Sequence, residues 1–142
     1  MLLIKTRVAS SGIHGLGLFA AEFVPSGTSI WRFESEFDHD FSPGQFAALP
    51  SLARAHVRWF CFVSRENGRV ILSGDHACFI NHSPEPNTGA PLDAVPPIAT
   101  VARRDIAVGE EITCNYWDYD ADTAWKLGLT SPDAPLGAKP QV

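Results

Sequence analysis

The chain has 142 residues, of which 45% are hydrophobic and 19% charged, and its formal net charge is -5 at pH 7. This length suits one domain, and this composition excludes disordered and fibrous classes. The acidic balance argues against nucleic acid as a direct partner, because binding to a phosphate backbone needs clustered Lys and Arg. The first apolar run, residues 2–4, is too short for a signal peptide or membrane span, so we expect a cytoplasmic protein without membrane contact.

Short apolar stretches between turn formers predict a mostly β protein. The expected strands, in chain order, are residues 2–8, 15–21, 29–37, 60–64, 70–72, 98–102 and 112–116. The expected helices are residues 46–49, 51–57 and 121–129. Ser42 and Pro43 have the chemistry of a helix N-cap and of the first helical position.

The loops and the end of the chain also carry signals. Asn67 and Gly68 lie between two predicted strands, which predicts a β-hairpin. The region 81–97 is dense in proline and turn formers, so we expect it to be largely irregular. We expect residues 1–130 to form a single domain and the proline-rich residues 131–142 to form a flexible tail.

Acidic residues alternate with other residues in two places. They are Glu34, Glu36, Asp38 and Asp40 in the first place, and Asp118, Asp120 and Asp122 in the second. If these segments are extended, each set shares one face of a strand. Such a face is either a solvated charged edge that discourages aggregation or a source of negative potential that attracts a basic peptide.

The three cysteines, Cys61, Cys78 and Cys114, are widely separated, and no CxxC pair is present. Their odd number suits buried free thiols in a reducing compartment better than a disulfide framework. We therefore expect no structural metal site.

The first segment that could carry chemistry is Gly15, Leu16 and Gly17. Glycines on both sides of one residue let the backbone approach a charged small molecule closely, although a plain tight turn explains the same pattern. The segment is not a dinucleotide fingerprint, because no third glycine opens a helix at the required spacing.

The second segment contains Asn81 and His82, with Asn87 a few residues later. The side-chain amide of an asparagine can bond both an ammonium and a carboxylate, and backbone groups at His82 can recognise an adenine edge. A single buried histidine is more often a core residue than a functional one, so the surrounding pattern carries the argument.

The third segment is residues 109–113, Gly-Glu-Glu-Ile-Thr, followed by Tyr116. By itself this is a turn between strands. The chain has only two tyrosines, however, and both Tyr116 and Tyr119 fall here. Such a concentration is expected of a site that needs a phenolic hydroxyl.

Together and in this order, the three segments resemble the SET-domain protein lysine methyltransferases over roughly residues 5–120. The resemblance implies a SET-domain fold of several short β-sheets with one or two short inserted helices. It also implies a C-terminal pseudoknot, in which the C-terminal segment crosses the Asn-His-Ser segment beside the cofactor, an exception to the usual avoidance of threaded chains.

The resemblance further implies S-adenosylmethionine as the cofactor. The backbone of residues 15–17 would contact its methionine part, and Asn81 and His82 would hold its amino and adenine ends. Tyr116 would be the catalytic tyrosine.

The reaction places a demand on the substrate pocket. Methyl transfer is an in-line displacement by a neutral amine, whereas free lysine has a pKa of about 10.4 and is mostly charged at neutral pH. An apolar, aromatic channel would favour the neutral form. Among the aromatic residues, most of which core packing alone would explain, the expected substrate-binding residues are Phe33, Phe62, Trp117 and Tyr119.

Several positions depart from the family pattern. Pro84 stands where many members have cysteine, and the later cysteine cluster that completes their zinc site is absent. These two differences imply a minimal, metal-free form in which other groups close the site, with Trp125 covering the adenine. Cys78 stands where arginine is common, and Phe33 where tyrosine is usual, which leaves the number of transferred methyl groups open.

Three functions are considered. The leading hypothesis is an S-adenosylmethionine-dependent protein lysine methyltransferase that acts on a histone-like, ribosomal or other lysine-rich protein, with a homodimer left open. The alternative is a SET-fold binding module for a basic peptide with little turnover. A third, a hydrolase using Cys78 with His76 or His82, lacks a recognisable nucleophile elbow or a group to orient the base.

Overall fold

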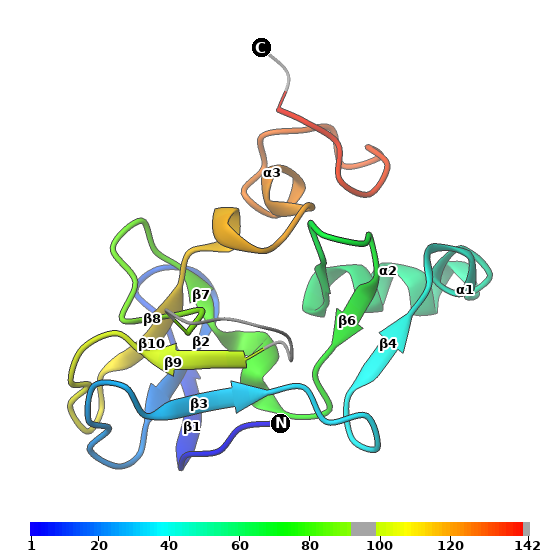
Figure 1. The fold of residues 1–142 in the computed structure, drawn as a ribbon. Coiled ribbons are helices and arrows are strands. Elements are labelled where there is room, and N and C mark those ends of the chain that lie inside the picture. The colour runs from blue at the N-terminus through cyan, green and yellow to red at the C-terminus, as the bar shows by residue number, and fades with distance from the viewer. Residues whose placement is uncertain (92–98, 141–142) are drawn as a thin grey trace. The chain divides into compact units, whose positions relative to one another are not determined.

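The computed structural model describes residues 1–91 and 99–140, which form two compact units. The first unit comprises Met1–Asp38 and Ser73–Asn115, and the second comprises His39–Leu72 and Tyr116–Val142. Short strands in several small sheets dominate, with three short α-helices (Figure 1). The predicted mostly β class with short inserted helices is confirmed.

The first unit contains two small sheets. One has the order β1-β2-β10-β7 and consists of β1 (Thr6–Ser10), β2 (Leu16–Ala20), β10 (Glu111–Cys114) and β7 (Asn81–His82). The other has the order β3-β9-β8 and consists of β3 (Ser29–Arg32), β9 (Ala99–Ala102) and β8 (Thr88–Gly89). A 3-10 helix, η1 (His76–Phe79), precedes β7. β7 and β10 run parallel, whereas the other pairs in both sheets are antiparallel.

The main buried cluster of the first unit is aliphatic, with Phe79 packed against it. The cluster consists of Leu18, Ala20, Val24, Ile30, Ala102, Ile106 and Ile112. Leu18 and Ala20 are two residues apart in β2, so they point to the same face of the sheet. Burial of this face fixes the register of β2 between β1 and β10, and it thereby sets the position of the turn at residues 15–17.

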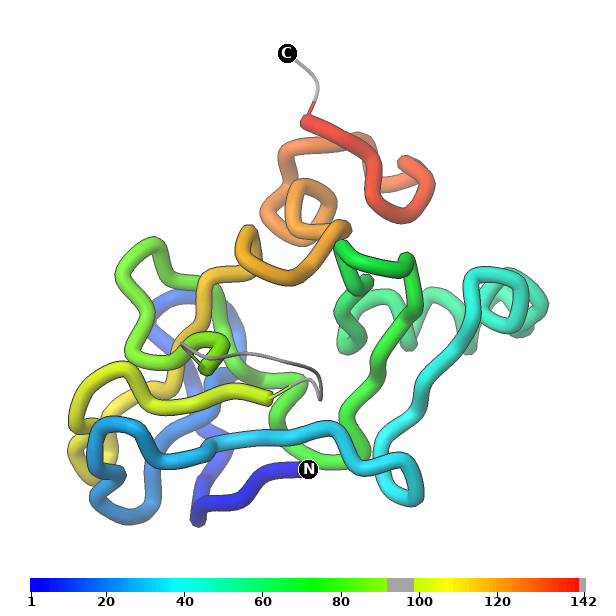
Figure 2. The backbone as a smooth tube through the Cα atoms, in the orientation of Figure 1, coloured from blue at the N-terminus to red at the C-terminus, as the bar shows by residue number. Residues whose placement is uncertain are grey.

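The second unit contains one sheet and the helices. The sheet has the order β4-β6-β5 and consists of β4 (His39–Phe41), β6 (Val70–Leu72) and β5 (Phe62–Val63), all antiparallel. The helices are α1 (Pro43–Ala47), α2 (Ser51–Phe60), the 3-10 helix η2 (Tyr116–Asp118) and α3 (Thr123–Lys126). The core consists of Phe46, Val57, Cys61, Val63 and Val70. Figure 2 traces the chain from η2 through α3 into the C-terminal segment.

The predicted hairpin is confirmed. β5 and β6 pair with Val63 opposite Val70, and the Ser64 amide donates to the Arg69 carbonyl oxygen at 2.8 Å. Gly68 has φ of 69°, a left-handed conformation that glycine adopts without steric cost. The Asn-Gly pair therefore fixes the turn as the sequence indicated.

The predicted N-cap of the first helix is also confirmed, with a reciprocal capping box. The Gln45 amide donates to Ser42 Oγ at 3.2 Å, and the Ser42 amide donates to Gln45 Oε1 at 2.8 Å. Ser42→Ala should lower the free energy of unfolding by about 1 kcal/mol, because it leaves a helix N–H unsatisfied. Urea unfolding measures this, with exposed Ser51→Ala as the control. Equal loss in both variants would contradict the capping role.

The third predicted strand is too long. β3 ends at Arg32, and residues 34–38 form a turn in which the Phe37 and Asp38 amides both donate to the Glu34 carbonyl oxygen. The Asp38 carboxylate is buried and accepts hydrogen bonds from the Glu34 and Gly74 amides, at 2.8 and 2.9 Å. The prediction that this segment has one shared acidic face is therefore wrong, because the Asp38 carboxylate is buried and stabilises a turn.

The second acidic alternation is also not a charged face. Asp120 and Asp122 are both fully buried, and each carboxylate forms an ion pair, with Lys126 and Arg58 respectively. A negative potential that attracts a basic peptide needs exposed charge. Asp120 and Asp122 therefore do not contribute the negative potential that the sequence predicted for this segment.

Other boundaries shift for local reasons. α2 continues to Phe60, three residues beyond Val57, so the strand expected from residue 60 begins at Phe62. α3 spans only Thr123–Lys126. It begins after the predicted residue 121 because the Asp120 side chain accepts from the Asp122 amide and holds the preceding residues in a turn, and it ends shortly before Gly128, whose φ is 71°. In the region expected to be irregular, β7 and β8 are two-residue strands, and residues 92–98 lie outside the described residues.

The segment expected to be a flexible tail makes specific contacts. Arg58 Nη1 donates to the Ala134 carbonyl oxygen at 2.7 Å, and the Gly137 amide donates to Asp122 Oδ1 at 2.9 Å. Leu136 packs against the core of the second unit. Flexibility of the tail stays a prediction, as does the single domain over residues 1–130. The contacts of the C-terminal segment with Arg58, Asp122 and the core had no signal in the sequence.

In the described part of the chain, no helix has the length and apolar character to cross a bilayer. The three cysteines are free thiols, with Cys61 and Cys114 buried and Cys78 half-buried. Burial raises the pKa of Cys61 to about 12. The threading of the C-terminal segment that the family resemblance implies stays a prediction.

Candidate active site

The two segments that carry the strongest sequence signal lie side by side. β7 and β10 pair in parallel, with Asn81 opposite Thr113 and His82 opposite Cys114. The Ser83 amide continues the ladder by donating to the Cys114 carbonyl oxygen at 3.0 Å. Two segments about thirty residues apart in the chain are thus joined by backbone hydrogen bonds.

Asn87, which follows the Asn-His-Ser segment in the chain, bonds to β10 through its side chain. It is 1% exposed, and its Oδ1 accepts from the Thr113 amide at 2.9 Å while its Nδ2 donates to the Glu111 carbonyl oxygen at 2.8 Å. Thr88 adds a bond from its hydroxyl to the Thr113 carbonyl oxygen at 2.7 Å. Because both the donor and the acceptor of the buried Asn87 amide are satisfied, its role is to attach residues 87–88 to β10.

Asn81 connects β7 to the glycine turn. It is 8% exposed, and its Nδ2 lies 3.0 Å from the Leu16 carbonyl oxygen, 3.2 Å from that of His14 and 2.9 Å from Glu111 Oε1. The structure therefore brings together Asn81 and the turn at residues 15–17, which the sequence assigned to one cofactor site.

The sequence analysis missed two side chains of this cluster, Glu111 and Ser11. Ser11 Oγ lies 2.8 Å from Glu111 Oε1 and 3.0 Å from Oε2, and it also accepts from the Ile13 amide at 2.9 Å. A Cβ atom at Gly17 would lie 2.2 Å from Glu111 Oε1, so glycine at this position makes room for the carboxylate. Glu111 belongs to a segment that the sequence singled out, whereas Ser11 had no signal.

Glu110 stabilises the turn before β10. Arg104 Nη2 lies 2.6 Å from Glu110 Oε1, and the Ala107 amide donates to Oε2 at 2.9 Å. The hydrogen bond from Arg104 lowers the pKa of Glu110 below its usual 4.5, aided by the bonds from Ala107 and Asn87 and opposed by partial burial.

A carboxyl group with a lowered pKa stabilises the folded state above its unfolded-state pKa, and the contribution is lost as pH falls through the folded-state value. We expect the free energy of unfolding to decline below about pH 4.5. Glu110→Gln should make this decline shallower, and urea unfolding across a pH series measures it. An identical pH profile in Glu110→Gln would show that Glu110 makes no such contribution.

The second unit holds the predicted catalytic tyrosine and three predicted substrate-binding residues. The rings of Tyr116 and Tyr119 lie 6.3 Å apart between centroids, at 76°. Phe62 meets Tyr119 edge to face at 5.2 Å. Trp117 is 40% exposed, and the Arg65 guanidinium lies 5.9 Å from its ring centroid. Tyr116, Tyr119 and Phe62 therefore form one aromatic cluster.

Trp125 has a different environment from the one expected. The Arg58 guanidinium lies 4.1 Å from its ring centroid, Trp59 lies 4.9 Å away, and its Nε1 donates to the Pro132 carbonyl oxygen at 2.9 Å. These residues line a pocket of about 390 Å³ within the second unit. Contact of Trp125 with an adenine stays a prediction.

The remaining predicted site residues are Phe33 and His82, both half-buried residues of the first unit. The structure thus gathers the predicted cofactor residues 15–17, Asn81 and His82 in the first unit. Tyr116, Phe62, Trp117, Tyr119 and Trp125 belong to the second unit. Their assigned roles stay predictions.

The SET domain family matches residues 15–117. A protein of Plasmodium falciparum (isolate 3D7) named "Putative histone-lysine N-methyltransferase 1" is 29% identical over 121 residues, which cover 80% of this chain and 2% of that protein. The chain therefore spans about 2% of the length of this curated relative.

Solved structures agree on the fold. Polycomb Repressive Complex 2 of Chaetomium thermophilum, in an autoinhibited conformation bound to S-adenosylmethionine, has a TM-score of 0.60 at 22% identity over 88% of this chain and 16% of that one. A Plasmodium falciparum protein described as a putative histone methyltransferase has a TM-score of 0.57 at 17% identity, over 81% of this chain and 95% of that one. The family match covers more than half of the residues, and the chain belongs to the SET-domain family.

Proposed function

We propose that this chain is an S-adenosylmethionine-dependent protein lysine N-methyltransferase. The observation that carries the proposal is the cluster around Asn81, in which the Asn-His-Ser segment pairs with β10 and the Asn81 side chain bonds to the glycine turn at residues 15–17. Membership of the SET-domain family and the printed name of the Plasmodium falciparum relative support the same activity.

The residues of this cluster fit the methionine end of the proposed cofactor. The carbonyl oxygens of His14 and Leu16 and the Glu111 carboxylate are acceptors that suit an ammonium group, and the Asn81 amide can bond an ammonium or a carboxylate. In the chain by itself, these acceptors all converge on Asn81 Nδ2. When bound, S-adenosylmethionine would supply an electrophilic methyl group on a sulfonium sulfur.

The chain's own contribution to the reaction would be orientation and exclusion of water. Tyr116 would present its phenolic oxygen to the methyl group through weak C–H to oxygen contacts. The aromatic rings of Tyr119 and Phe62 would surround the substrate amine and favour its neutral form. In-line alignment of amine, methyl carbon and sulfur then lowers the barrier without a strong acid.

The proposed substrate is a lysine in a basic protein, of which histones are one class. The net charge of -5 favours a basic partner, although the two acidic alternations do not supply the concentrated potential expected of them. The printed name of the Plasmodium falciparum relative supports the histone class.

The cysteine hydrolase is disfavoured by the state of its nucleophile. Burial raises the pKa of the Cys78 thiol, with a smaller contribution from Asp75. Cys78 is therefore held as the protonated thiol, which is less reactive than the thiolate. The binding module remains the competing function, because it uses the same fold and the same cluster.

Calorimetry with S-adenosylmethionine separates a cofactor-dependent enzyme from a module that binds only a peptide. We expect binding by the wild-type chain, followed by transfer of a labelled methyl group to a lysine-rich protein in extract of the source cell. Absence of binding by folded protein would favour the module.

A further inference from the structure

The backbone of Tyr116 is held by a short turn that ends at Asp120. The Asp120 amide donates to the Tyr116 carbonyl oxygen at 2.9 Å, and the Tyr119 amide donates to the same atom at 3.2 Å. The Tyr119 carbonyl oxygen accepts from the Arg65 amide at 3.2 Å. The position of both tyrosines therefore depends on how this turn is attached to the rest of the second unit.

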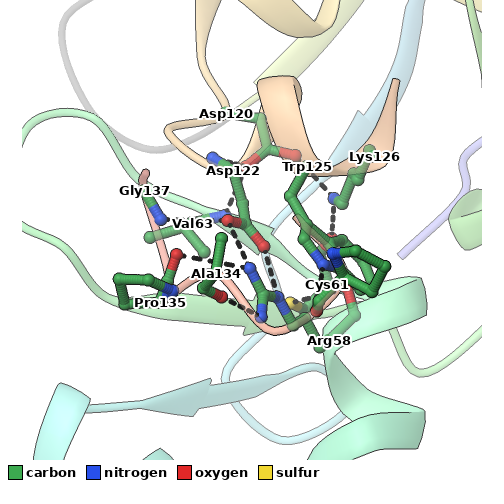
Figure 3. Close-up of polar contacts among 11 residues, drawn as sticks. Arg58, Cys61, Val63, Asp120, Asp122, Trp125, Lys126, Ala134, Pro135 and Gly137 are labelled. Atoms are coloured by element: carbon green, nitrogen blue, oxygen red, sulfur yellow. Dashed lines mark hydrogen bonds and ion pairs between the residues drawn. The ribbon is translucent and has the colours of Figure 1, made fainter. Parts of the chain in front are cut away.

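Asp120 attaches the turn to β5 through its side chain. The residue is fully buried, and its Oδ1 accepts from the Val63 and Asp122 amides, both at 2.9 Å. Its Oδ2 lies 2.5 Å from Lys126 Nζ (Figure 3). Removal of one partner from a buried ion pair leaves an uncompensated charge, which is strongly destabilising locally.

Lys126 has two further contacts that tie it to the tyrosine. Its ammonium group donates to the Cys61 carbonyl oxygen at the end of α2, and it lies 5.6 Å from the centroid of the Tyr116 ring. That separation is within the range of a cation–π attraction. The Lys126 side chain is 11% exposed, so solvent screens these interactions little.

We propose that Asp120 and Lys126 are a positioning pair for Tyr116. The inference rests on the proposed function, because it assigns Tyr116 to the reaction. Asp120 fixes the turn that carries the tyrosine backbone, and Lys126 fixes the ring from one side while it neutralises Asp120. Neither residue needs to touch substrate or cofactor.

A neighbouring ion pair offers a comparison within the same cluster. Asp122 accepts from Arg58 Nε at 2.8 Å, and Arg58 donates to the carbonyl oxygens of Ala134 and Pro135 (Figure 3). The side chains of this pair hold the C-terminal segment on α2, whereas the contact with Asp120 is made by the Asp122 backbone amide. The side chains of the two buried pairs thus hold different segments, the turn at residues 116–120 and the C-terminal segment.

The test replaces Lys126 in two ways and a second lysine as the control. Lys126→Met keeps a similar length but removes the ammonium, Lys126→Arg keeps a positive charge, and exposed Lys139→Met is the matched control. The first readout is amide hydrogen exchange at Tyr119 and Asp120, whose N–H groups bond to the Tyr116 carbonyl oxygen. It needs no activity, so it separates failure of this inference from failure of the proposed function.

We expect Lys126→Met to accelerate exchange at these two amides at least tenfold. Its kcat for methyl transfer should fall by a factor between about ten and one hundred, while its affinity for S-adenosylmethionine stays within about twofold, because a small misplacement of a reacting group costs turnover rather than cofactor binding. Lys126→Arg should recover most of both losses, and Lys139→Met should match the wild type.

Unchanged exchange at Tyr119 and Asp120 in Lys126→Met would overturn the inference, as would a loss of cofactor affinity equal to the loss of kcat. If Lys126→Met does not fold, the double variant Asp120→Asn with Lys126→Met removes the buried charge altogether. We expect it to fold with faster exchange at the two amides, whereas wild-type exchange and kcat would refute the positioning role.

Discussion

Tyr116→Phe is expected to lower kcat for methyl transfer about 100-fold, while the affinity for S-adenosylmethionine stays within about twofold. The substitution removes only the phenolic oxygen and keeps the ring that packs near Tyr119 and Lys126. The predicted cofactor residues 15–17, Asn81 and His82 belong to the first unit and Tyr116 to the second, so the cluster around Asn81 stays intact. Steady-state kinetics with a lysine-rich protein, together with calorimetry, measures both quantities.

Tyr119→Phe is the matched variant, because it removes the same atom from the chain's other tyrosine. We expect it to raise the KM for the protein substrate more than it lowers kcat, in line with a residue that surrounds the substrate amine. Unchanged turnover by Tyr116→Phe would reject the catalytic assignment, and equal effects of the two variants would show that the oxygens are interchangeable.

Asn81→Ala is expected to weaken binding of S-adenosylmethionine at least tenfold, or about 1.4 kcal/mol. The substitution removes the donor shared by the carbonyl oxygens of His14 and Leu16 and by Glu111, and it leaves these acceptors without that donor. The glycine turn then loses its attachment to β7. Calorimetry on folded protein, verified by thermal unfolding, measures the effect.

Asn67→Ala removes an amide of the same size from the hairpin of the second unit, where Asn67 Oδ1 accepts from the Arg69 amide. It should leave cofactor affinity unchanged. If Asn81→Ala also binds S-adenosylmethionine with wild-type affinity, Asn81 has only a structural role in the turn, and the proposed cofactor site must lie elsewhere.

The features that the sequence predicts correctly depend on local chemistry. The capping box at Ser42 and the hairpin at Asn67 and Gly68 need only residues within a few positions of one another. The mostly β class follows from short apolar runs between turn formers. The family resemblance adds the grouping of distant segments, which no periodicity in residues 81–87 or 109–113 could supply.

The features that the sequence does not predict depend on partners far along the chain. In the sequence, the spacing of Asp120 and Asp122 is that of an exposed acidic strand. In the structure, both carboxylates are buried and paired with Lys126 and Arg58. Alternation in the sequence cannot distinguish an exposed carboxylate from a buried, paired one. In the same way, Glu111 reads as part of a turn motif, and only the fold brings it to Ser11 and Asn81.

The C-terminal segment illustrates the same limit. Its prolines and small residues gave no hydrophobic pattern, so a flexible tail was the expected structure. Besides the packing of Leu136, its hydrogen bonds to Arg58 and Asp122 are made through backbone atoms, with Arg58 donating to carbonyl oxygens and Asp122 accepting from the Gly137 amide. Backbone groups are the same in every residue, so such contacts leave almost no trace in the sequence.

Transfer of methyl groups to lysine is measured most directly by mass spectrometry of a basic peptide after incubation with the chain and S-adenosylmethionine. A matched peptide carries arginine in place of every lysine. We expect methyl groups on the lysine side chains of the first peptide and none on the second, with S-adenosylhomocysteine formed in equal amount. Binding of S-adenosylmethionine without transfer to lysine in any of a panel of lysine-rich proteins would contradict the proposed activity.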